Sequence, residues 1–155
     1  RVSASLLKGF VLATGKPFMG INTLEALAGT VNLTSLQICA LLDAKKKEVY
    51  MAFFKYQNGQ IKRLSEDRVC PPETLRDLVT EPTVFVGSGI QTYGAMLSAH
   101  LGDLYTVEPG TGKYSLAASA GLLASARFDA EKSFSLDSLQ INYIRKSEAE
   151  IKLAC

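Results

Sequence analysis

The chain has 155 residues, of which 47% are apolar and 21% charged, an ordinary composition for a globular protein with one core or two small halves. A net charge of +2 is too small to indicate a nucleic-acid binder, and no apolar run has the length of about 18 residues that a membrane span needs. The sparse, odd-numbered cysteines favour a reducing compartment and lack metal or redox spacing: Cys39, Cys70 and Cys155.

Helical periodicity begins at once, over residues 1–14, and its apolar arc spans more than half of the helix circumference. The apolar positions form two stripes, one of Val2, Leu6, Phe10 and Ala13 and one of Ala4, Leu7 and Val11. A surface helix needs one stripe for its own core, so the second stripe predicts contact with a partner helix. The alternative is a helix buried inside a complete domain. No cap or turn precedes the helix, and we therefore expect a chain that is truncated at its N-terminus.

Gly15 and Pro17 are expected to end this helix, because glycine suits the left-handed position after a helix and proline cannot continue one. The apolar residues 18–21 predict a short strand. Asn22 and Glu25 fit a capping box for a second helix over residues 23–29.

The middle of the chain predicts a three-stranded meander. A continuous apolar run, a stretch rich in aromatic and β-branched residues, and a shorter stretch after Asn58-Gly59 are expected to form its strands, at residues 37–42, 48–56 and 60–64. Asn58-Gly59 is a strong hairpin signal, since both residues tolerate positive φ. The third strand is open to extension, through a bulge, as far as Cys70.

From Pro71 onward, helices and strands alternate. Helices are expected at residues 71–79, 90–101 and 114–128, and strands at 83–86 and 104–107. The resulting α/β order is β-β-β-α-β-α-β-α, and by analogy it resembles the ribonuclease H-like half-domain of the actin-like (ASKHA) group. We therefore divide the chain into residues 1–35, a remnant of a first actin-like subdomain; 36–128, a second ribonuclease H-like subdomain; and 129–155, a C-terminal tail.

Two glycine-rich segments invite comparison with phosphate-binding motifs. Gly87, Ser88 and Gly89 follow a strand and precede a helix, where backbone amides can cradle a phosphate. Thr92 breaks the dinucleotide fingerprint, so a tight turn and a nucleotide contact both stay open. Gly110-Thr111-Gly112-Lys113 resembles part of a P-loop, but the full motif is absent and we expect an ordinary loop.

The single histidine, His100, offers no zinc motif, and a position near a helix end explains it. A polar group surrounds one turn of the meander, and either a solvated hairpin or a recognition surface accounts for it: Asp43, Lys45, Lys46, Glu48 and Tyr50.

Four blocks of the sequence stand out: residues 20–28 read GINTLEALA, residues 41–50 LLDAKKKEVY, residues 86–89 VGSG and residues 142–145 NYIR. In this order they resemble blocks of the TsaB (YeaZ) family, also labelled glycoprotease-like, in which the first two read GVSSLEALA and LIDARRGEVY. Residues 86–89 resemble its VGxG turn, and residues 142–145, with Tyr143 and Arg145, resemble xYLR. Arg1 resembles the last residue of GPGSFTGLR. Lys47 replaces the usual glycine, and Ile141 stands where proline is common.

The resemblance implies a non-catalytic, cytoplasmic scaffold that lacks the metal-binding histidine pair of its paralogue TsaD. It implies pairing with a TsaD-like paralogue and a TsaE-like ATPase for threonylcarbamoyladenosine modification of tRNA. In their absence it implies a homodimer, with tRNA contacted indirectly and no membrane partner. The resemblance implies no metal and no cofactor of its own, although ATP or ADP is compatible with the assembled complex. Partner contact is expected at Val2, Ala4, Leu6, Leu7, Phe10 and Val11.

Tyr143 and Arg145 are expected to extend the recognition surface of Asp43, Lys45, Lys46, Glu48 and Tyr50. The alternative function is a nucleotide-dependent phosphotransferase or ATPase of the same fold, which would contact nucleotide at Gly87, Ser88 and Gly89. A glycoprotease-type peptidase is less favoured, because the sequence shows no metal set or activated nucleophile for it.

Overall fold

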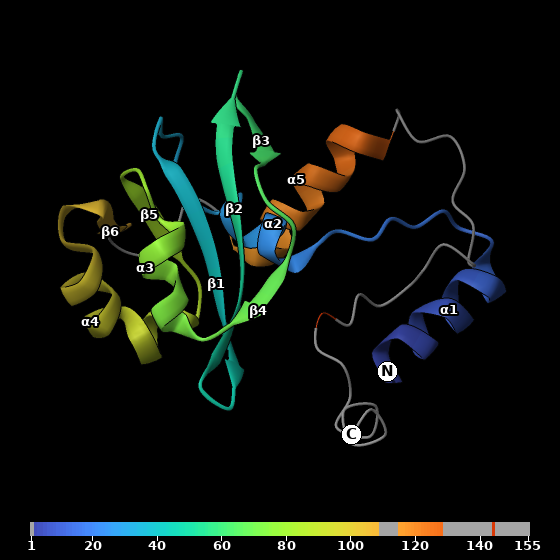
Figure 1. Ribbon diagram of the computed structural model, residues 1–155. Coiled ribbons are helices and arrows are strands. Elements are labelled where there is room, and N and C mark those ends of the chain that lie inside the picture. Colours follow the sequence, from blue (N-terminus) through green and yellow to red (C-terminus); the bar gives the residue numbers. More distant parts are fainter. Residues whose placement is uncertain (1, 109–114, 129–143, 145–155) are drawn as a thin grey trace.

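A computed structural model describes residues 2–108, 115–128 and 144 of the chain (Figure 1). Its helices are α1 (Val2–Thr14), α2 (Thr23–Ala28), α3 (Leu75–Leu78), α4 (Gly89–Leu101) and α5 (Leu116–Phe128), with single 3₁₀ turns at Pro72–Thr74 and Gly102–Leu104. Its strands are β1 (Gln37–Lys45), β2 (Glu48–Gln57), β3 (Gln60–Arg63), β4 (Arg68–Cys70), β5 (Thr83–Val86) and β6 (Tyr105–Val107).

The strands form one mixed sheet in the order β3-β2-β1-β5-β6, with β4 also paired to β2. The β1, β2 and β3 pairs are antiparallel, while β1, β5 and β6 run parallel. Helices α3 and α4 cover one face of the sheet, and α2 with α5 lies on the other (Figure 1). This is the topology that the order of predicted elements required, so the predicted fold class is confirmed.

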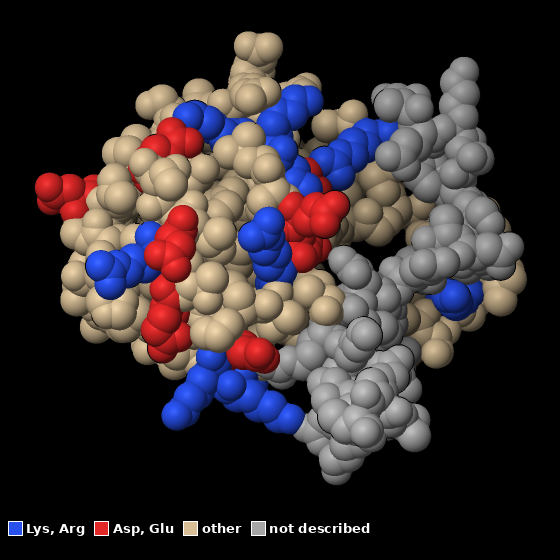
Figure 2. Space-filling view, in the orientation of Figure 1, with Lys and Arg blue, Asp and Glu red and all other residues tan. Residues whose placement is uncertain are grey.

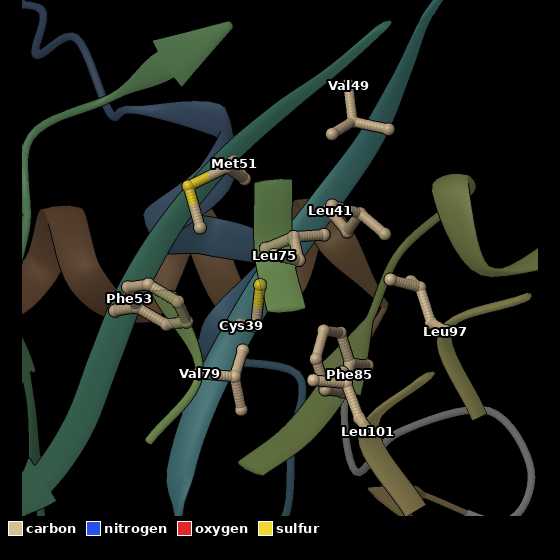
Figure 3. Packing of buried hydrophobic residues seen from close by; sticks show 10 residues of the cluster. All are labelled: Cys39, Leu41, Val49, Met51, Phe53, Leu75, Val79, Phe85, Leu97 and Leu101. Carbon is tan, nitrogen blue, oxygen red and sulfur yellow. The ribbon is translucent and has the colours of Figure 1, made fainter. Parts of the chain in front are cut away.

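Both faces of β1 are buried, which explains its continuous apolar run. Cys39 and Leu41 point into the cluster under α3 and α4, which also contains Met51, Leu75 and Phe85 (Figure 3). Ile38 and Ala40 point the opposite way, into the cluster under α2. The period of two along a strand therefore divides one apolar run between two cores.

Several local predictions are confirmed by the backbone. Helix α1 ends where expected, and Gly15 has φ of 63° while its N–H donates to Val11 O over 2.9 Å. Asn58 and Gly59 both have positive φ, 51° and 75°, and join β2 to β3 in a two-residue turn. The Asn22 side chain accepts the N–H of Glu25, as a capping residue should.

Two local predictions are wrong in detail, and a third takes one of the forms that the sequence left open. Residues 18–21 form no strand, because they have no partner strand among the described residues. The third strand is broken into β3 and β4, since the Ser65 hydroxyl replaces a strand partner and accepts the N–H of Phe53 over 2.9 Å. The helix expected at 71–79 opens as a 3₁₀ turn and is only Leu75–Leu78 as α-helix.

The division of the chain into three parts stays a prediction. Helix α2, placed in the first part, packs against β1 and β2 and supplies Leu24 and Ala28 to the core. The expected tail lies outside the described residues, apart from Ile144. In the described parts of the chain, no helix has both the length and the apolar character needed to cross a membrane.

Candidate functional site

Helix α1 carries the residues predicted to bind a partner, and none of its side chains is buried. It stands apart from the sheet, at the end of the link that leads to α2 (Figure 1). We call its predicted contact set the α1 surface: Val2, Ala4, Leu6, Leu7, Phe10 and Val11. The sheet and its two clusters take none of these side chains into their cores.

The two stripes of α1 differ in exposure. In the first stripe, Val2 is 85% exposed, Leu6 74% and Phe10 61%. In the second stripe, Leu7 is 42% exposed, and Ala4 and Val11 are partly buried. An exposed apolar stripe of this length on one helix is unusual for a monomer. The first stripe is therefore the stronger candidate for contact with another protein.

The second candidate site is the turn between β1 and β2, where Asp43 organises the backbone. Its carboxylate accepts the N–H of Lys45 over 2.8 Å and pairs with the Lys45 ammonium over 2.9 Å. Three lysines in a row have positive φ: Lys45 (60°), Lys46 (54°) and Lys47 (60°). Left-handed backbone is costly for residues that carry a Cβ, so the Asp43 contacts stabilise a strained turn.

These contacts perturb both charged groups in the expected directions. The side-chain hydrogen bond from Lys45, followed by that from its backbone N–H, lowers the pKa of Asp43. The same side-chain contact raises the pKa of Lys45. The ion pair of Asp43 and Lys45 therefore has a structural role in the turn, and it places a charged carboxylate near the end of β1.

The sheet separates the members of the predicted recognition surface. Asp43 stands opposite Val49, whose side chain lies in the cluster under α4, and the Asp43 carboxylate also interacts with the Thr92 side chain on α4. Tyr50 stands opposite Leu42 and packs against the cluster under α2. Asp43 and Tyr50 thus face opposite sides of the sheet.

The other members of that set fall in two groups. Lys45 and Lys46 lie exposed on the turn, and Glu48, partly buried, begins β2 opposite Lys45. Tyr143 and Arg145 lie outside the described residues. The recognition surface as a whole stays a prediction.

The glycine turn at residues 87–89 packs directly against β1 at Leu41. Gly87 has φ of 118°, and a Cβ there would lie 2.3 Å from Leu41 O and 2.6 Å from Leu27 Cδ2. A Cβ on Gly89 would lie 2.8 Å from Leu41 Cγ. Close approach of the Leu41 backbone therefore requires glycine at position 87, and the Leu41 side chain leaves little room for a Cβ at position 89, which supports the tight-turn interpretation.

The same turn brings Ser88 next to Asp43. The backbone N–H of Asp43 donates to Ser88 Oγ over 3.4 Å, which joins the ends of β1 and β5. The carboxyl ends of parallel strands are where open α/β sheets bind ligands. The predicted nucleotide contact at Gly87, Ser88 and Gly89 thus has a suitable location, although the close packing explains the glycines without a ligand.

The remaining sequence candidates have structural explanations or lie outside the described residues. His100 lies exposed in the last turn of α4, and the part of the chain that the structure describes holds no cluster of three metal-binding side chains. Residues 110–113 are not among the described residues. Burial raises the pKa of the Cys39 thiol and also that of the partly buried Cys70 thiol, so both are poor nucleophiles.

Sequence reasoning missed how α5 attaches to the domain. Ser119 Oγ donates to Ala26 O over 2.6 Å, and Arg127 pairs with the Glu25 carboxylate. Only half of the predicted capping box therefore forms. The Asn22 side chain accepts the N–H of Glu25, but the Glu25 carboxylate turns to α5. Ser119 and Arg127 are eight positions apart, slightly more than two helical turns, and therefore lie on the same face of α5. This spacing was the signal available in the sequence.

These contacts leave a groove between α5 and β3, with a volume of about 510 Å³. Its lining comes from the α2 C-terminus, the β2–β3 hairpin and α5: Gly29, Leu33, Tyr56, Gly59, Gln60, Ile61, Lys62, Ser119, Leu122, Leu123, Ala126 and Arg127. We call it the β3–α5 groove.

Comparisons with known proteins agree with this architecture. The family model described as "TsaD: tRNA N6-adenosine threonylcarbamoyltransferase" matches residues 1–153. A crystal structure of an uncharacterized protein with similarity to peptidase YEAZ from Pseudomonas aeruginosa superposes with a TM-score of 0.72 and 18% identity, over 94% of this chain and 67% of the other.

A structure of YeaZ from Pseudomonas aeruginosa superposes with a TM-score of 0.65 and 19% identity, over 92% of this chain and 66% of the other. At these identities the likeness shows the fold, and the chain spans about two thirds of each of the two structures. The comparison with curated proteins found no match.

Proposed function

Because the chain belongs to the TsaD family of tRNA-modification proteins, with the fold of YeaZ (TsaB) structures, we propose that it is a non-catalytic subunit that pairs with a TsaD-type paralogue. The pairing would use α1, and the complex would modify adenosine in tRNA with threonylcarbamoyl. A TsaE-like ATPase would join the complex, and two copies of the chain would associate when the paralogue is absent. The setting would be the cytoplasm.

One observation supports this proposal above the others, which is the exposure of the first stripe of α1. Val2, Leu6 and Phe10 lie one helical turn apart and are all more than half exposed. A partner helix laid along them would cover all three at once. The small side chain of Ser3 and the absence of a side chain at Gly9 allow the two helix backbones to approach closely.

The exposed area is large enough to matter for affinity. Fully burying a large apolar side chain contributes about 1.5–3 kcal/mol, so covering the exposed fractions of these three would contribute roughly 3–7 kcal/mol. Loss of translational and rotational freedom opposes this gain. A partner that supplies a similar stripe would raise the gross gain to a level consistent with a stable pair.

The experiment is a double substitution, Leu6→Asp with Phe10→Asp, tested by co-purification with the TsaD-type paralogue and by sedimentation velocity of the chain alone. We expect both associations to be lost, because two carboxylates would be desolvated at the contact. Leu12→Asp is the matched control, since Leu12 is 72% exposed, close to the 74% of Leu6, and lies on the same helix outside the α1 surface. Association that survives the double substitution would refute the role of α1.

A second candidate function is nucleotide binding at the end of β1, as in a phosphotransferase or ATPase of the actin-like fold. The observation in its favour is the contact between the Asp43 backbone and Ser88 Oγ at the glycine turn. Calorimetry with ATP distinguishes the two proposals, because the scaffold alone predicts no heat of binding. Among the residues that the structure describes, no observation favours a glycoprotease-type peptidase.

A further inference from the structure

Strand β3 forms one edge of the sheet, and half of its backbone groups point away from β2. In the hairpin, Gln60 stands opposite Gln57 and Lys62 opposite Lys55, and the N–H of Leu64 donates to Phe53 O over 2.8 Å. Antiparallel pairing alternates along a strand, so the groups of Ile61 and Arg63 face outward. Within the described chain, β3 pairs with no strand besides β2. An edge of this kind can accept another strand.

The β3–α5 groove runs beside this edge. Its floor includes Ile61, only 8% exposed, whereas Leu33 and Leu122 remain 72% and 54% exposed at its sides. Helix α5 cannot close onto β3, because Ser119 and Arg127 hold it against α2. Burial of the two leucines by a ligand would therefore cost no rearrangement of the helix.

The charge of the groove indicates what it would accept. The described residues that line it include two cations, Lys62 and Arg127, and no acidic residue. The ion pair with the Glu25 carboxylate offsets the charge of Arg127, so Lys62 carries the remaining positive charge of the lining. Lys and Arg side chains also gather over β3 and α5 on the surface, with acidic side chains beside them (Figure 2). Lys62 is exposed, and the alternation along β3 places its side chain on the sheet face opposite to Ile61, so the acidic residues of an added strand would lie beside Lys62 while its apolar residues enter the groove.

We propose that the β3–α5 groove binds an extended, acidic segment of a partner protein, which adds to β3 as a further strand. Backbone groups of the segment pair with those of Ile61 and Arg63, and its alternate apolar side chains lie between Leu33 and Leu122. A groove between an edge strand and a helix is a recurring arrangement for this mode of peptide recognition. The site is separate from the α1 surface and does not depend on the proposed function.

Binding is tested on the full chain with a fluorescent peptide of about eight residues that alternates Val with Asp. Two companion peptides carry N-methyl groups on alternate amides or Lys in place of Asp. We expect the Val/Asp peptide to bind saturably in fluorescence anisotropy. Both companions should bind at least about tenfold more weakly, because the N-methylated peptide lacks backbone donors and the Lys peptide has the opposite charge.

Variants locate the site. Leu33→Ser with Leu122→Ser should weaken binding about tenfold or more, and both positions are exposed enough to leave the fold intact. Leu12→Ser on α1 is the matched control, since Leu12 is also 72% exposed, and it should bind the peptide as the unchanged protein does. Equal weakening by both variants would refute the location.

Amide hydrogen exchange distinguishes strand addition from other contacts. The peptide should slow exchange at Ile61 and Arg63 and leave Gln60 and Lys62, which already face β2, unchanged. The proposal is wrong if the N-methylated peptide binds as well as the parent, if those two amides are unaffected, or if none of the peptides binds. Protection of Ile61 and Arg63 that rises with protein concentration alone would replace it with self-pairing of the edge.

Discussion

Substitution of Gly87 by alanine tests whether the glycine turn is required by packing. The new Cβ would lie 2.3 Å from Leu41 O, a backbone atom that cannot move without disturbing β1. Overpacking of this kind costs about 1–3 kcal/mol. The φ of 118° is unfavourable for alanine and adds about 1–3 kcal/mol. We expect Gly87→Ala to lower the free energy of unfolding by about 2–6 kcal/mol.

Two other glycines separate the contributions. Gly59 has φ of 75°, but a Cβ added there would meet no atom within 4 Å, so Gly59→Ala should lose only about 1 kcal/mol. Gly20 has neither positive φ nor a close neighbour, and Gly20→Ala should be neutral or slightly stabilising. Urea denaturation followed by circular dichroism gives all three values, provided that the slopes agree.

The reasoning fails if Gly87→Ala is no more destabilising than Gly59→Ala. The close approach to Leu41 would then be absent in solution, and the glycine would need a functional explanation. Loss of ATP binding with unchanged stability would favour the nucleotide-binding alternative.

Two further predictions concern the Asp43 turn. Lys47→Gly should raise the free energy of unfolding by about 1 kcal/mol, because glycine adopts φ of 60° without the Cβ penalty, and an unchanged or lower denaturation midpoint would contradict the strain. Asp43→Asn should lower the thermal midpoint near neutral pH and have little effect at strongly acid pH. The folded-state pKa of Asp43 is lowered, so its stabilisation is present above the unfolded pKa of about 3.9 and is lost as the pH falls through the folded pKa. A difference between the proteins that stays constant with pH would show that the charge of Asp43 plays no part.

Local residue choice was sufficient to predict most elements. Asn58-Gly59 specified its hairpin because few pairs of residues adopt positive φ at both positions. Gly15 specified a helix end because glycine adopts positive φ without a steric penalty. Both faces of β1 are buried because helices cover both sides of the sheet, and the sequence shows this burial as a continuous apolar run. The failure at residues 18–21 has a related cause, since an apolar run is a strand only where another strand pairs with it.

The candidate site was less predictable. Both stripes of α1 were visible in the sequence, but their unequal exposure was not. Asp43 and Tyr50 were grouped by proximity along the chain, and the pleat of the sheet places them on opposite faces. The β3–α5 groove left no sequence signal as a groove, because it arises where α5 docks on α2 and stops short of β3.

By itself, the sequence determined the order of helices and strands, the main turns and the resemblance to a family, because these depend on neighbouring residues and on short periodic patterns. Tertiary structure alone decided which stripe of α1 is exposed, why Gly87 must lack a side chain and where Glu25 finds its partner. Those outcomes depend on contacts between residues far apart in the chain, and no local pattern encodes the distance between Gly87 and Leu41 or between Glu25 and Arg127.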